Sequence, residues 1–200
     1  KIYDVTALGE MLIDFAVNGE SEQGNQLFEA CPGGAPCNVL AMLNKLGRKT
    51  AFIGKVGDDQ FGKLLRDTIT NIGIEAKGLV MDQDIHTTLA FVHTFPDGDR
   101  EFSFYRKPGA DMLMEAKDVD AAWFQDAYAL HFCSVSLGEF PMKEAHRKAI
   151  DCARRAGCMI SFDPNIRLPL WENPEALRNV IWEFAPMAHV LKISDEELEF

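Results

Sequence analysis

The chain has 200 residues, of which 47% are hydrophobic and 26% are charged, so it can bury one sizeable core. Its formal net charge of −11 and its scattered basic residues argue against nucleic acid or an anionic membrane surface as a partner, because both carry dense negative charge. No apolar run approaches the roughly 18 residues that a membrane-spanning helix needs, and the N-terminal residues lack the pattern of a signal peptide. The cytoplasm is therefore the expected compartment.

Five cysteines are spread along the chain without a Cys-x-x-Cys pair. An odd number without that spacing favours neither a disulfide framework nor a zinc site. We therefore expect ordinary reduced thiols at Cys31, Cys37, Cys133, Cys152 and Cys158.

Short β-branched and aromatic runs alternate with amphipathic helical patterns, which predicts an α/β fold with a mainly parallel sheet. The first strands are expected at residues 5–8 and 11–17, followed by a polar loop over 18–26. A helix is predicted over 36–46, because a proline marks its start and a glycine follows its end.

The same alternation continues along the chain. A strand is expected at 50–56 and a helix at 59–72, whose inward side chains are predicted to be Phe61, Leu64, Leu65, Ile69 and Ile72. Further elements are predicted as helices over 140–156 and 174–185, strands over 158–162 and 190–193, and the start of a helix over 194–200. Two strand-like runs, 86–95 and 100–106, flank a hairpin turn at 96–99 and predict a small antiparallel appendage.

A glycine pair opens the most informative stretch, Pro32-Gly33-Gly34-Ala35-Pro36-Cys37-Asn38. Glycine lets the backbone approach a ligand closely, and the helix start that follows presents Asn38, an arrangement suited to binding hydroxyl groups. By itself the motif is equally consistent with a tight turn entering a helix.

The stretch downstream adds specificity. Gly47 and the run Gly54-Lys55-Val56-Gly57-Asp58-Asp59-Gln60-Phe61-Gly62 resemble the first signature of the ribokinase-like (PfkB) carbohydrate kinases. The resemblance covers the whole chain as the N-terminal two-thirds of such an enzyme, and it includes Gly9-Glu10 and Asp14. The runs at 102–111, 162–171 and 191–198 are similar to the fructokinase branch.

This resemblance implies an incomplete ribokinase-like domain over residues 1–200, with α/β/α layers and a small β lid contributed by about 11–17, 86–95 and 100–106. It implies ATP-dependent phosphorylation of a sugar hydroxyl, fructose to fructose 6-phosphate in the first place, with Mg²⁺ as cofactor and a possible homodimer through the lid. Alternatives within the family are 2-keto-3-deoxygluconate kinase and nucleoside-type kinases. From other classes, a non-catalytic sugar-binding module stays open, whereas a nucleotide-binding oxidoreductase is disfavoured because Gly9-Glu10-Met11 follows the first strand in place of G-x-G-x-x-G.

The resemblance also assigns substrate-binding residues. Asp14 is expected to accept hydrogen bonds from sugar hydroxyls, and the Gly33-Gly34 backbone with Asn38 is expected to complete the sugar floor. Phe104 and Arg106 join the substrate-binding set from the lid.

Phosphate contacts are expected from Arg167 and Asn165, which follow a strand in a loop where open sheets form their active sites. A guanidinium group matches phosphate oxygens, so Arg106 could likewise contact the new sugar phosphate. An ordinary surface arginine is the alternative for each, and the position after a strand or beside the lid favours a functional role.

Ser194 and Glu197 form an S-x-x-E capping box, which is a sufficient structural reason for both residues. In the family this position carries N-x-x-E, whose glutamate organises magnesium and phosphate through water. Lys192 and Glu197 are therefore the expected cofactor-binding residues, with Glu197 acting on the metal indirectly.

The G-A-G-D motif that supplies the catalytic base in this family does not occur in the 200 residues. The similar Pro108-Gly109-Ala110-Asp111 lies in the connection after the lid strands. The base is expected beyond Phe200, so the 200-residue chain is expected to be inactive alone.

Overall fold

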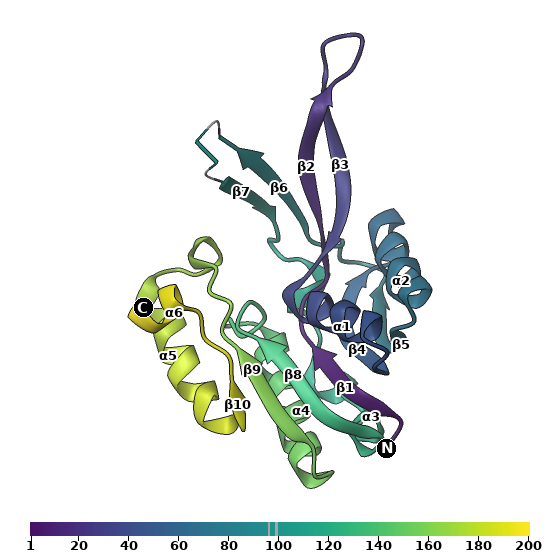
Figure 1. Cartoon of the computed structure of the whole chain (residues 1–200), viewed down its shortest axis with the longest axis vertical. Coiled ribbons are helices and arrows are strands. Elements are labelled where there is room, and N and C mark those ends of the chain that lie inside the picture. The colour runs from purple at the N-terminus through teal and green to yellow at the C-terminus, as the bar shows by residue number, and fades with distance from the viewer. Residues whose placement is uncertain (96, 99) are drawn as a thin grey trace.

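A parallel six-stranded sheet forms the body of the molecule in the computed structural model, which describes residues 1–95, 97–98 and 100–200. The strand order is β10-β9-β8-β1-β4-β5 (Figure 1). The strands are β1 (Tyr3–Leu8), β4 (Thr50–Gly57), β5 (Glu75–Asp82), β8 (Ala127–Cys133), β9 (Met159–Asp163) and β10 (Val190–Leu191). Parallel neighbours need crossover connections, and helices supply most of them here.

Helices cover both faces of this sheet. They are α1 (Ala35–Lys45), α2 (Gln60–Ile72), α3 (Ala122–Gln125), α4 (Pro141–Arg155), α5 (Pro174–Phe184) and α6 (Asp195–Glu199). On one face, Leu40 of α1 and Leu65 of α2 pack into one buried cluster with Phe52. On the other face, α4 and α5 form a second cluster, which includes Phe132 and Phe184. The structure therefore confirms the predicted α/β/α layers and the mainly parallel sheet.

The helix boundaries follow the capping signals of the sequence. Asp59 caps α2 by accepting a hydrogen bond from the Gly62 amide at 2.8 Å, and Gly73 ends that helix in a left-handed conformation with φ 99°. Asn173 caps α5 in the same way through the Ala176 amide. The predicted inward face of α2 was wrong at Leu64 and Ile72, which are 40% and 39% exposed, because the buried stripe of the helix is narrower than the sequence pattern.

A second, four-stranded sheet projects from one end of the body as a lid (Figure 1). Its order is β3-β2-β6-β7, with β2 (Leu12–Glu20), β3 (Gln26–Gly33), β6 (Leu89–Thr94) and β7 (Arg100–Tyr105). Strand β2 pairs antiparallel with β3 and parallel with β6, and β6 pairs antiparallel with β7. The lid therefore combines two hairpins from separate parts of the chain.

The predicted loop over 18–26 is shorter in the structure, because β2 continues to Glu20 and β3 begins at Gln26, which leaves 21–25 as the connection. Strand β3 lies at the edge of the lid and is largely exposed, so it lacks the alternation of apolar and polar residues that marks a half-buried strand. An edge position also tolerates Pro32, which has no amide proton to donate to a neighbouring strand.

Other boundaries differ by a few residues from the sequence prediction. β6 begins at Leu89, three residues after the expected start at 86, and β10 covers only 190–191 of the predicted 190–193. Of the predicted turn at 96–99, Pro96 and Asp99 lie outside the described residues. Within the described part of the chain, no helix combines the length and the apolar character needed to cross a membrane.

Candidate active site

A cavity of about 410 Å³ lies between the inner face of the lid and the ends of the body strands. Because side chains alternate along a strand, every second residue of β2 faces it, namely Leu12, Asp14 and Ala16. The other lining residues are Glu10, Cys31, Gly34, Ala35, Asn38, Val92, Thr94, Arg100, Phe102, Phe104, Val135, Asn165, Arg167 and Leu170. The cavity thus brings together the predicted residues Asp14, Gly34, Asn38, Phe104, Asn165 and Arg167.

A larger cavity of about 710 Å³ lies elsewhere, beside the N-terminus of α2. Its lining includes Phe61, Leu89 and Tyr105, and its polar side chains Asp59, Thr87 and Arg106 are engaged in contacts within the protein. Ligand sites combine apolar walls with a few converging polar groups, and the smaller cavity has them in Asp14, Asn38 and Arg167. We therefore take the smaller cavity as the candidate site.

Asp14 is half-buried on β2, and burial raises the pKa of its carboxyl group while the charge of Arg167 lowers it. The two side chains therefore place opposite charges across the cavity. Gly33 lies against this carboxylate, because a Cβ atom there would come within 2.5 Å of Asp14 Oδ2. A side chain at position 33 would displace Asp14, which explains the first glycine of the pair although Gly33 is not among the described lining residues.

Gly34 turns the chain from the lid into α1. Its φ of 124° is unfavourable for other residues, and a Cβ atom would come within 2.5 Å of the Glu10 carbonyl oxygen. Asn38 lies one turn into α1, is exposed, and lines the cavity. The glycine pair therefore lets this turn pack closely against the lid, and the helix that follows places Asn38 at the floor of the cavity.

Asn165 and Arg167 lie in the loop after β9, on the opposite wall of the cavity. Asn165 adopts φ 45°, a left-handed conformation that asparagine tolerates, and its amide donates to Asp163 Oδ1 at 3.1 Å. The Arg167 side chain is anchored only by a bond to the neighbouring Ile166 carbonyl among its described contacts, so its other donors are available to an anion.

Arg106 is not among the described lining residues of the candidate cavity, but it lines the larger one together with Phe104. Its side chain is 6% exposed and pairs with Asp111 at 2.7 Å, and it also donates to the Val135 carbonyl at 3.3 Å. The guanidinium lies 5.2 Å from the ring centre of Phe140.

Glu197 and Lys192 also lie outside that lining. The predicted capping box is present, since Glu197 Oε2 accepts from the Ser194 amide at 2.9 Å and Ser194 Oγ accepts from the Glu197 amide. Glu197 Oε1 accepts from the Ile166 amide at 2.9 Å, which ties α6 to the loop carrying Arg167. Burial raises the pKa of Glu197, but the amide hydrogen bonds outweigh it, so the net shift is downward. Lys192 Nζ lies 3.3 Å from Asp163 Oδ2.

Several cavity residues escaped the sequence analysis as site residues, among them Glu10, Cys31 and Phe102. Phe102 could have been found from Phe104, because residues two apart in a strand share a face. Cys31 could not, since the sequence pattern predicts no strand over 27–31.

A lid over a polar cavity at the ends of parallel strands defines a class of protein that encloses a small polar ligand. The chain belongs to the pfkB family of carbohydrate kinases, because the family model matches residues 3–200. It is 42% identical over 198 residues to the probable fructokinase-3 of Arabidopsis thaliana, covering 98% of this chain and 57% of that protein.

Solved structures give the same picture. The ATP-bound fructokinase of Xylella fastidiosa superposes with a TM-score of 0.91 at 36% identity, covering 100% of this chain and 60% of that one. A Vibrio cholerae O395 fructokinase double mutant with fructose, ADP and potassium ion bound superposes at 0.87 and 33% identity, covering 100% and 62%. The chain thus spans about three-fifths of the length of the relatives it matches.

Proposed function

We propose that the protein carrying this chain phosphorylates a sugar hydroxyl with ATP, and that fructose is converted to fructose 6-phosphate. The observation that carries this proposal is the cavity beneath the lid, where Asp14 and Asn38 line the same space as Arg167. The family membership and the fructokinases among its relatives support the choice of reaction.

In this proposal Asp14 accepts hydrogen bonds from adjacent sugar hydroxyls, while the amide of Asn38 both donates and accepts. Phe104 and the Gly33-Gly34 turn shape the enclosure. An analogue without a hydroxyl would leave these polar groups unpaired, which is the usual source of selectivity among sugars. Arg106 acts on the sugar only through the elements it holds, because Asp111 engages its guanidinium.

Arg167 and Asn165 contact the transferred phosphoryl group from the far wall. The planar guanidinium suits an anion with several oxygens and stays charged at all relevant pH values. When bound, ATP with Mg²⁺ supplies the phosphoryl group and neutralises its charge. Glu197 suits indirect contact with the metal, because each carboxylate oxygen accepts one amide proton and keeps a lone pair for water. Lys192 adds a positive charge beside it.

The outer face of the lid supports a homodimer as part of the same proposal. Phe15, Phe28, Phe91 and Tyr105 form a chain of ring contacts there, with centroids 4.9 to 5.4 Å apart. Tyr105 remains 66% exposed and Phe28 37% exposed. A second lid packed on this face would remove the rings from water. Light scattering should therefore show a dimer for the wild type and a monomer for the Tyr105→Glu variant.

The test of the reaction is a coupled ADP assay on the whole protein with fructose, 2-keto-3-deoxygluconate and nucleosides. The highest kcat/KM is expected for fructose. A preference for another substrate would redirect the assignment within the family, and sugar binding without ADP release would favour a non-catalytic module. The 200-residue chain alone is expected to release no ADP, because it contains no G-A-G-D motif for the base. The free cysteines suit the reducing cytoplasm proposed as its compartment.

A further inference from the structure

A cluster of buried polar side chains lies where the lid meets the body. Glu10 is 2% exposed, Asp111 and Thr88 are each 1% exposed, and Ser136 is fully buried. Buried polar groups are costly unless they are hydrogen-bonded to one another, so a connected set of them in this position needs a reason.

The cluster ties both ends of the β6–β7 hairpin to Asp111. Thr88 directly precedes β6, and its hydroxyl donates a short hydrogen bond to Asp111 Oδ1. Arg106 directly follows β7, and its Nε donates to Asp111 Oδ2 at 2.8 Å. Gly109 makes this closure possible, because a Cβ atom there would overlap Thr88 Oγ1 at 1.8 Å.

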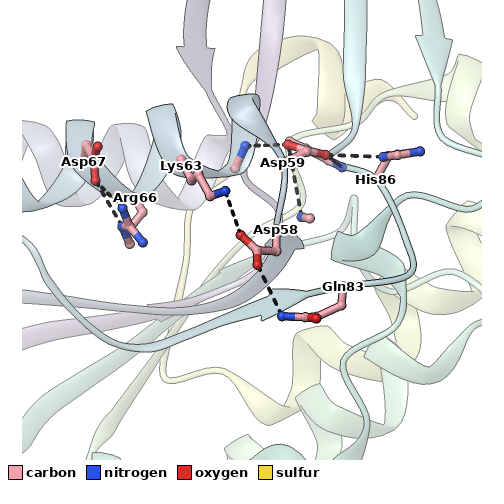
Figure 2. Close-up of polar contacts among 10 residues, drawn as sticks. Asp58, Asp59, Lys63, Arg66, Asp67, Gln83 and His86 are labelled. Carbon is pink, nitrogen blue, oxygen red and sulfur yellow. Dashed lines mark hydrogen bonds and ion pairs between the residues drawn. The ribbon is translucent and has the colours of Figure 1, made fainter.

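A second carboxylate holds the same end of β6. Asp59, the cap of α2, accepts from the amide and the hydroxyl of Thr87, each at 2.8 Å, and lies 3.6 Å from His86 Nδ1. Figure 2 shows Asp59 between the start of α2 and His86. The root of the hairpin is therefore fixed to two elements of the body.

Glu10 extends this cluster to the floor of the cavity. Arg106 donates to the Val135 carbonyl at 3.3 Å, and the next residue, Ser136, donates to Glu10 Oε2 at 3.3 Å. Glu10 Oε1 accepts from the Ala35 amide at 3.0 Å. Because the first amides of a helix have no partner within it and Gly34 has no side chain to cap α1, Glu10 caps this helix from a distant position in the chain.

The groups that face Glu10 come from each element packed around it. They are the Ala35 amide and the Cys37 thiol of α1, the Cys133 thiol of β8, Ser136, Arg106 and Asp111. The pKa of Glu10 is raised to about 7, and burial of the carboxyl group is the largest cause. The charge of Asp111 also raises this pKa, whereas the amide hydrogen bonds and the charge of Arg106 lower it.

We propose that Glu10 is a positioning residue that holds the first turn of α1, and with it Gly34 and Asn38, in a fixed relation to the root of the lid. The proposal rests on the proposed function in taking this cavity as the sugar site. A carboxylate accepts a stronger hydrogen bond than a neutral carboxyl. For an opening in which Glu10 stays buried, the bond to the Ala35 amide is therefore stronger as the pH rises through about 7, where Glu10 ionises.

The test is hydrogen exchange at the Ala35 amide of the whole protein without sugar, expressed as a protection factor at about pH 6 and about pH 8. Wild type should show greater protection at the higher pH. Glu10→Met removes the acceptor and should lower protection by about tenfold at about pH 8 and by less at about pH 6. Glu10→Gln keeps one acceptor without its titration, so its protection should be the same at both values.

Ala35 protection equal to that of wild type in a folded Glu10→Met variant would overturn the proposal. Equal protection at both pH values in wild type would show that Glu10 does not ionise in this range, and this result does not depend on whether the Met variant folds. The KM of wild type for fructose should fall as the protection of the Ala35 amide rises. A KM that does not change with this protection would show that the first turn of α1 does not affect sugar binding. Asp14→Asn is the matched control, since it lines the same cavity without touching α1 in the described contacts. Asp14→Asn should weaken fructose binding and leave the protection of the Ala35 amide unchanged. Unchanged fructose binding in this variant would contradict the sugar site without affecting the conclusion about Glu10 and Ala35.

Discussion

Individual side chains in the cavity are arranged by charge across its two walls. Arg167 stands opposite Asp14, and its guanidinium retains free donors because its only described hydrogen bond uses one nitrogen. A lysine at this position would keep the charge and lose the planar fork. Binding and turnover should therefore respond differently to that substitution.

We expect Arg167→Lys in the whole protein to lower kcat about tenfold while the Kd for sugar changes little, because two-oxygen contact with the phosphoryl group is lost and the charge opposite Asp14 is kept. Steady-state kinetics and calorimetry measure the two quantities separately. Arg178→Lys, which alters an exposed arginine outside the described lining of the cavity, is the control. An equal loss in binding and turnover would contradict the assigned role.

Glu197→Gln separates capping from cofactor binding. Two amides, those of Ser194 and Ile166, donate to its two oxygens, and a glutamine offers only one oxygen. Losing one hydrogen bond to a charged acceptor should cost about 1.5 kcal/mol and lower the Tm by about 3 °C. The magnesium concentration needed for half-maximal kcat should also rise. A lower Tm with unchanged magnesium dependence would leave the cap as its only role, and no change in either would refute both.

Two buried groups give folding stability opposite pH dependences. The pKa of Glu10 is raised from 4.5 to about 7, so its contribution is complete below pH 4.5 and is lost as the pH rises to about 7. The pKa of His146 is lowered from 6.5 to about 4, chiefly by burial, so its contribution is present above pH 6.5 and is lost as the pH falls.

Glu10→Gln removes the first of these titrations. The stability of the variant relative to wild type should therefore increase from about pH 5 to about pH 7.5, by at most about 3 kcal/mol. Urea unfolding at the two pH values measures it. A constant difference between variant and wild type would show that Glu10 does not titrate in this range. Ionised Glu10 thus stabilises the floor locally at a cost in global stability.

The lid elements show which parts of the fold a sequence can predict. Capping residues and glycine stops located α1, α2 and α5, because those signals are local. The sequence pattern does not predict β8, because this strand is largely buried on both faces and its residues do not alternate between apolar and polar. β3 was missed for the opposite reason, as an exposed edge strand. Among site residues, the family resemblance located Asp14 and Phe104 in strands and Gly34, Asn38, Asn165 and Arg167 at turns, whereas Glu10 needed the fold to reveal its contacts.

The ion pair at the root of the lid should be the most sensitive point of this element. Asp111→Asn leaves the Arg106 charge buried without its partner and should destabilise the protein by about 3–5 kcal/mol. Asp58→Asn is the control, because its pair with Lys63 at 3.3 Å lies at the surface (Figure 2) and should contribute about 0–1 kcal/mol. Chemical denaturation compares the two variants. Equal effects would mean that the buried pair does not anchor the lid.

Hydrogen exchange should also distinguish lid from body. The four lid strands carry exposed aromatic residues such as Tyr105 and pack on the body along part of their length, as at Phe15 and Phe61, whereas β8 lies between two strands and two helical layers. Amides of β6 and β7 should therefore exchange faster than those of β8, and slow when sugar binds. Identical exchange with and without sugar would argue against a closing lid.

At the scale of the whole molecule, a rigid parallel sheet presents one wall of the cavity and a separately tethered lid presents the other. Loops at the carboxyl ends of the strands carry Arg167, and the lid carries Asp14, so the site is complete only when the two parts are correctly placed. The buried cluster around Arg106 fixes that placement. The proposed sugar affinity would thus be a property of both parts together.

The most direct test of the central claim is the affinity of the whole protein for fructose, measured by calorimetry in wild type and in Asp14→Asn. A bond between a buried carboxylate and a hydroxyl is worth about 1.5–3 kcal/mol, so the variant should bind about 10- to 100-fold more weakly, and Asn38→Ala should show a smaller loss. The account predicts measurable fructose binding in wild type and this weakening in the folded variants. Equal affinity in wild type and both variants would contradict the claim that the cavity beneath the lid is the sugar site.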